Sequence, residues 1–229
     1  MSDPTPVPSA LDPSRVPVHV AWVTGDGRAA DGRGNGAGGR AEDVAAASDV
    51  ALADLVEGAL SVGIRWLTVA GTAGSAVGEA LATWPLRRVA EVPARVAVRR
   101  FGPDGVCDER GADAPVLVVT LAVGYSGRAE VLRAVERLAA EGVAPKDVDE
   151  TAIAGRLYDP SMPDPDLMVR SGGERLLSDL LLWEMTYAEL LFLDDLWPAI
   201  RRGHLYDAVV EFQRRHRRYG GIVSAGSRR

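Results

Sequence analysis

The chain has 229 residues, of which 47% are hydrophobic and 25% charged, and this length and composition are typical of one soluble globular domain. The formal net charge of −6 argues against nucleic acid as a partner, because phosphate contacts need concentrated Lys and Arg. Cys107 is the only cysteine, which excludes an internal disulfide and a cysteine-based metal site and favours a reducing, cytoplasmic location.

The chain begins with a segment over residues 1–15 that is rich in Pro, Ser and Asp, and we expect it to be a disordered tail. It lacks the apolar run of a signal peptide. Residues 16–24 form an apolar, β-branched run that predicts a first strand, and a Gly-rich stretch over residues 25–40 follows. The next predicted element is a helix ended by Gly63, whose apolar residues recur at helical spacing: Leu52, Leu55, Val56, Ala59 and Leu60.

The remaining predicted elements alternate between strands and helices. Strands are predicted over residues 64–70, 95–100, 116–123, 167–170 and 190–193. Helices are predicted over residues 128–141, around 180–185 and over 205–217. Strands that alternate with helices and read as continuous apolar runs predict an α/β fold, with a mostly parallel central sheet flanked by helices. The domain is expected to cover residues 16–221, with a C-terminal tail over 222–229, and no apolar run approaches the roughly 20 residues that cross a bilayer.

The most specific motif lies over residues 163–192, PDPDLMVRSGGERLLSDLLLWEMTYAELLF. It resembles the signature of the cis-prenyltransferase (undecaprenyl diphosphate synthase) family. Further stretches resemble other landmarks of that family, in the family's order: HVA at 19–21, GYSGRAE at 124–130, DLWP at 195–198 and RRYGG at 217–221. The chain is therefore identified as a divergent member of this family, and the resemblance implies a cis-prenyltransferase-like fold.

The resemblance also implies a reaction. In this family an allylic diphosphate ionises with the help of Mg²⁺, the double bond of isopentenyl diphosphate attacks, and loss of a proton leaves a cis double bond. The ligands implied are isoprenyl diphosphates, and Mg²⁺ is the cofactor if the chain is active. The partner implied is a second prenyltransferase subunit, in a homodimer or heterodimer, and proximity to a membrane arises only through a lipid product.

The C-terminal half keeps much of the site that the family uses for isopentenyl diphosphate. Arg170 and Ser178 match diphosphate-binding residues, and Glu174 and Glu189 match family carboxylates, of which Glu189 is the implied metal ligand. Leu176 stands where the family has a second Arg. The alternative for Arg170 and Glu174 is an ion pair with each other.

The C-terminal sequence Arg218-Tyr-Gly220 matches the family's Arg-x-Gly, which completes the isopentenyl diphosphate site of the partner subunit. An Arg followed by glycines suits this role, because the Arg supplies charge and the glycines allow close approach. The alternative is a solvated basic tail.

The N-terminal half departs from the family pattern. The family has Asp-Gly-Asn-Gly-Arg after its first strand, and the aligned residues 24–28 read Thr-Gly-Asp-Gly-Arg. Thr24 thus replaces the catalytic carboxylate, unless Asp26 takes its place as catalytic and metal-binding residue. Gly27 and Arg28 match the diphosphate-binding end of this run. Residues 72–77 likewise lack the family's Phe-Ser-x-Glu-Asn-Trp block.

Three functional hypotheses follow. The first is a catalytically degenerate subunit, a pseudoenzyme that dimerises with an active prenyltransferase and completes its isopentenyl diphosphate site. The second is an active prenyltransferase or prenyl-diphosphate-processing enzyme, in which Asp26 and Glu189 hold Mg²⁺. The third is a prenyl-diphosphate-binding protein. His19, inside the first strand, is expected to be either a hydrogen-bonded core histidine or a histidine that faces a loop.

Overall fold

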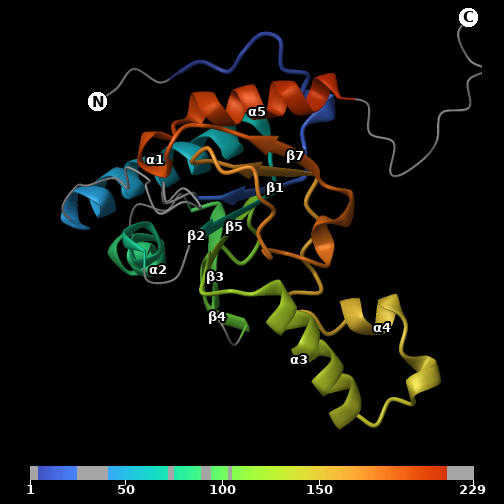
Figure 1. Cartoon of the computed structure of the whole chain (residues 1–229). Coiled ribbons are helices and arrows are strands. Elements are labelled where there is room, and N and C mark those ends of the chain that lie inside the picture. Colours follow the sequence, from blue (N-terminus) through green and yellow to red (C-terminus); the bar gives the residue numbers. More distant parts are fainter. Residues whose placement is uncertain (1–4, 25–40, 72–74, 89–93, 103–104, 216–229) are drawn as a thin grey trace, which may run out of the picture.

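The central feature of the fold is a seven-stranded sheet with the strand order β4-β3-β5-β2-β1-β6-β7 (Figure 1). The computed structural model describes residues 5–24, 41–71, 75–88, 94–102 and 105–215. Neighbouring strands are parallel except β3 and β4, which are antiparallel. The strands are β1 His19–Val23, β2 Trp66–Gly71, β3 Val96–Gly102, β4 Gly105–Gly111, β5 Leu117–Val123, β6 Leu167–Arg170 and β7 Glu189–Phe192. The predicted α/β class with a mostly parallel sheet is confirmed.

Helices flank this sheet. The α-helices are α1 Ala41–Val62, α2 Ala76–Arg88, α3 Gly127–Ala140, α4 Glu150–Ala154 and α5 Arg202–Arg214. Short 3₁₀ helices are η1 Pro13–Arg15, η3 Pro145–Asp147, η4 Glu184–Tyr187 and η5 Trp197–Ala199. Figure 1 shows α1 and α5 together on one side of the sheet, with α3 extending from the other side. In the described part of the chain, no helix is long and apolar enough to cross a membrane.

The two faces of the sheet have separate cores, because successive side chains of a strand point to opposite faces. Val20 and Trp22 of β1 belong to the core that α1, α2 and α5 cover. Ala21 and Val23 belong to the opposite core, which includes Met162, Leu180 and Leu181 from segments outside the helices. This second core positions the segment between β6 and β7, which contains much of the family signature.

His19 is buried at the start of β1, as expected. Its Nδ1 lies 2.7 Å from the Pro163 carbonyl oxygen and its Nε2 lies 2.9 Å from the Thr68 hydroxyl. Burial lowers the pKa of the imidazole to about 4, because the charged form is poorly solvated there. The expected hydrogen-bonded core histidine is confirmed.

The prediction of a helix around residues 180–185 is wrong. The chain forms turns there, and only the short η4 follows. Leu181 has φ of 50°, in the left-handed region that a right-handed α-helix cannot accommodate. Its side chain is fully buried in the second core, so tertiary packing overrides the local apolar pattern. Helices α2 and α4 and the antiparallel strand β4 were not predicted from the sequence.

The N-terminal segment packs on the domain before the expected boundary. Leu11 is 9% exposed and belongs to the core under α1 and α5. The Asp12 N–H donates to the Gln213 side-chain oxygen at 3.0 Å, and the Gln213 amide donates to the Asp12 carbonyl at 2.7 Å. Residues 11 and 12 thus contact the domain, because α5 offers an apolar contact and a side-chain partner. The predicted limits of the tail and of the domain stay predictions.

Candidate functional site

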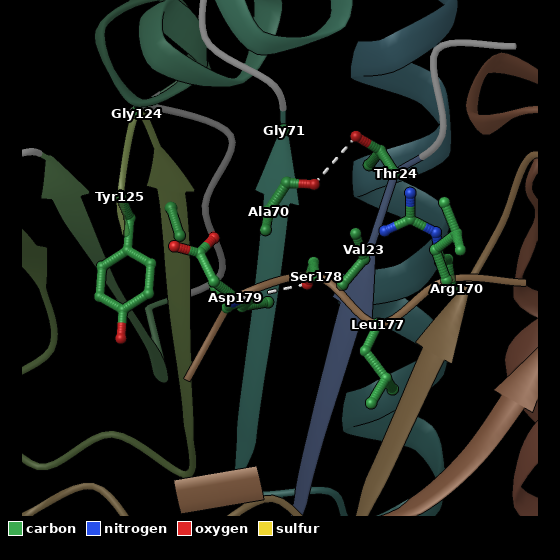
Figure 2. A pocket seen from close by; sticks show the side chains of 13 residues that line it. Val23, Thr24, Ala70, Gly71, Gly124, Tyr125, Arg170, Leu177, Ser178 and Asp179 are labelled. Atoms are coloured by element: carbon green, nitrogen blue, oxygen red, sulfur yellow. Dashed lines mark hydrogen bonds between the residues drawn. The ribbon is translucent and has the colours of Figure 1, made fainter. Parts of the chain in front are cut away.

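A pocket of about 380 Å³ lies at the carboxyl ends of β1, β2, β5 and β6. This edge is where open α/β sheets generally bind ligands. The pocket is lined by Val23, Thr24, Ala70, Gly71, Ala122, Gly124, Tyr125, Arg170 and residues 176–180. Figure 2 shows Arg170 and Thr24 on one side and Tyr125 and Asp179 on the other, with Ser178 between them.

Thr24 follows directly after β1 and is 4% exposed. Its hydroxyl donates a hydrogen bond of 2.9 Å to the Ala70 carbonyl oxygen at the end of β2, drawn in Figure 2. The Thr24 N–H donates to the same oxygen, also at 2.9 Å. The hydroxyl is thus used to join two strand ends.

Arg170 ends β6 and is the cation that lines the described pocket. Its guanidinium donates to the Glu174 carboxylate, and the two side chains are 15% and 20% exposed. The ion pair left open as an alternative in the sequence is present. The Arg170 Nε is buried and has no hydrogen-bond partner in the described residues. One donor of the guanidinium therefore remains unused.

Residues 178–180 are held against the start of α3. The Asp179 carbonyl oxygen accepts from the Gly127 N–H at 3.0 Å, and the Asp179 carboxylate accepts from the Ser126 hydroxyl at 2.7 Å. The Ser178 hydroxyl oxygen accepts from the Leu180 N–H at 3.3 Å. These contacts place Ser178 in the same pocket as Arg170, and the binding of one diphosphate by both residues stays a prediction.

A buried acidic cluster lies behind Tyr125. The Tyr125 hydroxyl donates to Glu130, whose other carboxylate oxygen accepts from the Tyr158 N–H at 2.8 Å. Glu184 is 7% exposed, and its Oε2 has no hydrogen-bond partner among the described residues. Burial, and then the charge of Glu130, raises the pKa of Glu184 to about 7. Burial also raises the pKa of Glu130, so the cluster favours neutral carboxyl groups.

Glu189 lies at the amino ends of the parallel strands, opposite the carboxyl ends where this pocket lies. It begins β7 and pairs with Leu167, the first residue of the parallel strand β6, whereas Arg170 is the last residue of that strand. The Glu189 carboxylate accepts from the Arg215 guanidinium at 3.3 Å. Within one chain, Glu189 is therefore separated from Arg170 and Ser178.

Comparison with known proteins decides the family. The family model described as "Putative undecaprenyl diphosphate synthase" matches residues 107–220. The chain is 35% identical to the trans,polycis-polyprenyl diphosphate synthase ((2Z,6E)-farnesyl diphosphate specific) of Thermobifida fusca, across 95% of this chain and 87% of that relative. This chain belongs to the cis-prenyltransferase (undecaprenyl diphosphate synthase) family.

Two further proteins are similar to this chain, one in sequence and one in fold. The chain is 29% identical to an isoprenyl transferase of Clostridium tetani, across 93% of this chain and 92% of the relative. The structure of lavandulyl diphosphate synthase from Lavandula x intermedia, in complex with dimethylallyl diphosphate, superimposes with a TM-score of 0.72. That match has 21% identity and covers 90% of this chain and 99% of the other, so it shows a shared cis-prenyltransferase fold.

Several predicted site residues lie outside the described residues. They are Asp26, Gly27 and Arg28 after β1, and Arg218 and Gly220 near the C-terminus. Their assigned roles stay predictions. The structure does place Arg170, Glu174 and Ser178 around or beside one pocket, and it places Glu189 elsewhere.

The described residues include no group of three or more metal-binding side chains. Asp26, one of the two carboxylates predicted to hold Mg²⁺, lies outside the described residues, so the Mg²⁺ site stays a prediction. Thr24 follows β1, Glu174 is paired with Arg170, and Asp179 accepts from Ser126. Magnesium is usually held by one or two protein carboxylates together with water and substrate phosphates, and the described carboxylates of Glu174 and Asp179 already have hydrogen-bond partners.

Sequence reasoning missed the pocket roles of Tyr125, Leu177 and Asp179. Tyr125 lies within the GYSGRAE motif, so the motif itself was a signal. Leu177 and Asp179 flank Ser178 in the family signature, but which of these neighbours faces the pocket depends on the turn that replaces the predicted helix. Glu184 gave no local signal, because its burial beside Glu130 arises only from packing.

Proposed function

We propose that this cis-prenyltransferase-like protein is a catalytically degenerate subunit, which dimerises with an active prenyltransferase and completes the partner's isopentenyl diphosphate site. The observation that carries the proposal is the hydrogen bond of the Thr24 hydroxyl. Thr24 stands where the family pattern has its catalytic Asp, and its hydroxyl is bonded to the Ala70 carbonyl. A Thr hydroxyl is neutral, so it lacks the negative charge with which the family's Asp holds a metal ion.

The extent of the family match supports the same proposal. The matched residues 107–220 begin after the Thr24 run and after residues 72–77, and they include Arg218 and Gly220. The named relatives are transferases and synthases, so the proposal rests on the positions where this chain departs from the family pattern. A family-model match over residues 107–220 suits a chain that contributes to a partner's site through its C-terminal half.

The test is incorporation of labelled isopentenyl diphosphate with Mg²⁺ and short allylic diphosphates. The purified chain alone is expected to give no product. Mixed with an active cis-prenyltransferase from the same organism, it is expected to form a heterodimer and to raise turnover above that of the partner alone. Formation of the heterodimer is measured separately, by light scattering after size-exclusion chromatography.

The decisive variant is Arg218→Ala, which should abolish the gain in turnover without preventing heterodimer formation. Arg214→Ala is the matched control. It removes the same charge from the same end of the chain. The Arg214 side chain is 74% exposed, and its ion pair with Glu211 is long, at 4.0 Å. Equal loss of turnover in both variants would indicate a general charge effect and would contradict the proposal.

Clear product from the isolated chain would instead support the active enzyme in which Asp26 replaces the missing carboxylate. Asp26→Ala should then abolish that product. No product, no heterodimer and no gain in turnover would leave the binding protein as the remaining hypothesis.

A further inference from the structure

The loop between β6 and β7 forms one wall of the pocket. We name residues 176–188 the pocket flap, and its first five residues line the pocket. The structure describes all of the flap, and apart from the short η4 the flap contains no helix or strand. Its position therefore depends on tertiary contacts. The Asp179 carbonyl oxygen accepts from the Gly127 N–H of α3, and Leu180 and Leu181 are buried in the second core.

Glu184 is a buried carboxyl group at the start of η4, within the flap. It is 7% exposed, and its Oε2 has no hydrogen-bond partner among the described residues. The described charged groups that act on it are Glu130 of α3 and Asp164 of the loop before β6, and both are acidic. The Tyr125 hydroxyl also lies close to Glu184, but it donates to Glu130. No cation from the described part of the chain offsets these acidic neighbours.

Two cations of α3 are bound elsewhere. Arg133 donates to the Tyr158 hydroxyl, and Arg137 donates to the Arg156 carbonyl oxygen. Backbone N–H groups close to the Glu184 carboxylate oppose the effect of burial only in part. An ionised Glu184 would therefore be buried, poorly solvated and close to other acidic groups, which costs free energy. A protonated Glu184 avoids most of that cost.

A strained residue precedes Glu184 in the flap. Leu181 has φ of 50°, a left-handed conformation that is unfavourable for a residue with a branched side chain. Burial of the Leu181 side chain in the second core maintains it. The Met185 N–H donates to the Leu181 carbonyl oxygen at 2.9 Å, so the turn that contains Glu184 and the strained residue form one hydrogen-bonded unit. Movement of Glu184 into water would break this unit and release the strain.

We propose that the pocket flap is a pH-sensitive gate, closed while Glu184 is protonated and opened when Glu184 is ionised and moves into water. The residues that line the pocket are continuous with this turn, so opening removes one wall of the pocket. The protonation of a single carboxyl group thus decides whether Leu177 and Ser178 line the site. This inference goes beyond the proposed function and does not depend on it.

The direction of the pH effect follows from proton binding. In the open flap Glu184 has its ordinary pKa of 4.5, whereas in the closed flap burial raises that pKa to about 7. Opening between these two values releases a proton, so the equilibrium constant for opening rises with pH and levels off above pH 7. The expected increase is about 20-fold between pH 5.5 and pH 7.5.

The test is native-state hydrogen exchange of the full-length chain at several pH values from 5.5 to 7.5, corrected for the exchange rate of unstructured amides at each pH. The reporters are the N–H groups of Gly127, Met185 and Ala188, which donate to Asp179, Leu181 and Met185 respectively. Their opening constants should rise about 20-fold over this range. Gly127 reports on the part of the flap that lines the pocket, because its acceptor Asp179 does so.

Urea separates opening of the flap from global unfolding. Low concentrations of urea should leave the opening constants of the three reporters nearly unchanged, because a local opening exposes little surface. The N–H groups of the central strand β1 should instead exchange faster as urea is added. The variant Glu184→Gln is neutral throughout and should abolish the pH dependence of the reporters. Glu136→Gln, at an exposed position of α3, is the matched control and should behave like the parent chain.

Each other outcome overturns the proposal. Equal opening constants at pH 5.5 and pH 7.5, or a pH dependence that Glu184→Gln retains, would exclude Glu184 as the controlling group. Reporters that respond to urea as strongly as β1 would show global unfolding only. Opening at Met185 and Ala188 without opening at Gly127 would show that the wall of the pocket stays in place. Because the assay contains no prenyl ligand and no partner subunit, its failure is distinguishable from failure to stimulate an active prenyltransferase.

Discussion

The Thr24 hydroxyl and the Ala70 carbonyl oxygen are joined by a hydrogen bond of 2.9 Å. The bond links the carboxyl ends of β1 and β2 at the pocket, and the Thr24 N–H donates to the same oxygen. A residue at the position of a family catalytic Asp thus has a structural role in this chain.

Replacing Thr24 tests that structural role. Thr24→Val should lower the free energy of unfolding by about 1 kcal/mol, because a buried hydroxyl bond is lost while the shape is nearly kept. Thr24→Ser retains the hydroxyl and should cost less. The measurement is urea unfolding of both variants, and equal stability of Thr24→Val and the parent chain would contradict the role.

Glu184 predicts a pH dependence of stability. Its folded pKa of about 7 exceeds its ordinary value of 4.5, so between these values the folded state holds a proton that the unfolded state has released. The contribution of Glu184 to stability is therefore lost as pH rises from about 4.5 to about 7. Glu184→Gln, which is neutral throughout, should gain about 3 kcal/mol relative to the parent chain across this range.

The measurement for Glu184 is urea unfolding at several pH values from 4 to 8. Glu136→Gln is the control, because Glu136 is exposed on α3, and its difference from the parent chain should stay nearly constant. A constant difference for Glu184→Gln as well would show that Glu184 does not titrate as its burial implies.

Gly127 permits α3 to begin against the pocket segment. A Cβ at this position would lie 2.3 Å from the Asp179 carbonyl oxygen and 2.7 Å from the Leu182 Cβ. Gly127→Ala should therefore displace residues 179–182 and lower the free energy of unfolding by about 1–3 kcal/mol. Gly203→Ala, whose new Cβ would meet its nearest neighbour at 3.9 Å, should be neutral or slightly stabilising. Thermal unfolding of both variants compares them, and equal melting temperatures would contradict the clash.

Leu11 tests where the folded domain begins. Leu11→Ala should lower the free energy of unfolding by about 2 kcal/mol, because Leu11 is 9% exposed in the core. Val7→Ala in the same segment should stay within about 0.5 kcal/mol, since Val7 is 43% exposed. Deletion of residues 1–10 should likewise be tolerated, and deletion of 1–15 should not. Urea unfolding measures the stability of both deletion variants. If they are equally stable, the folded domain begins at residue 16, as the sequence predicts.

Most strands of the parallel sheet and the helices α1, α3 and α5 could be predicted from the sequence by itself, because strand and helix patterns are local, whereas α2, α4 and β4 were not predicted. The run at residues 167–170 became β6, and the spacing from Leu52 to Leu60 became the middle of α1. The family could be predicted as well, since its signature over residues 163–192 is long and contiguous. Arg170 and Ser178 were predicted as site residues in this way, because each matches one position of that signature, and both line one pocket.

Only the tertiary structure decided how the signature residues meet. Packing of Leu181 into the second core converts a helical pattern into a turn, and this turn brings Leu177 and Asp179 to the pocket. Parallel pairing of β6 and β7 places Glu189 at the far edge from Arg170. Burial of Glu184 beside Glu130 raises the pKa of Glu184. These relationships join residues from separate elements, and contacts of that kind depend on long-range packing, which local spacing along a chain does not encode.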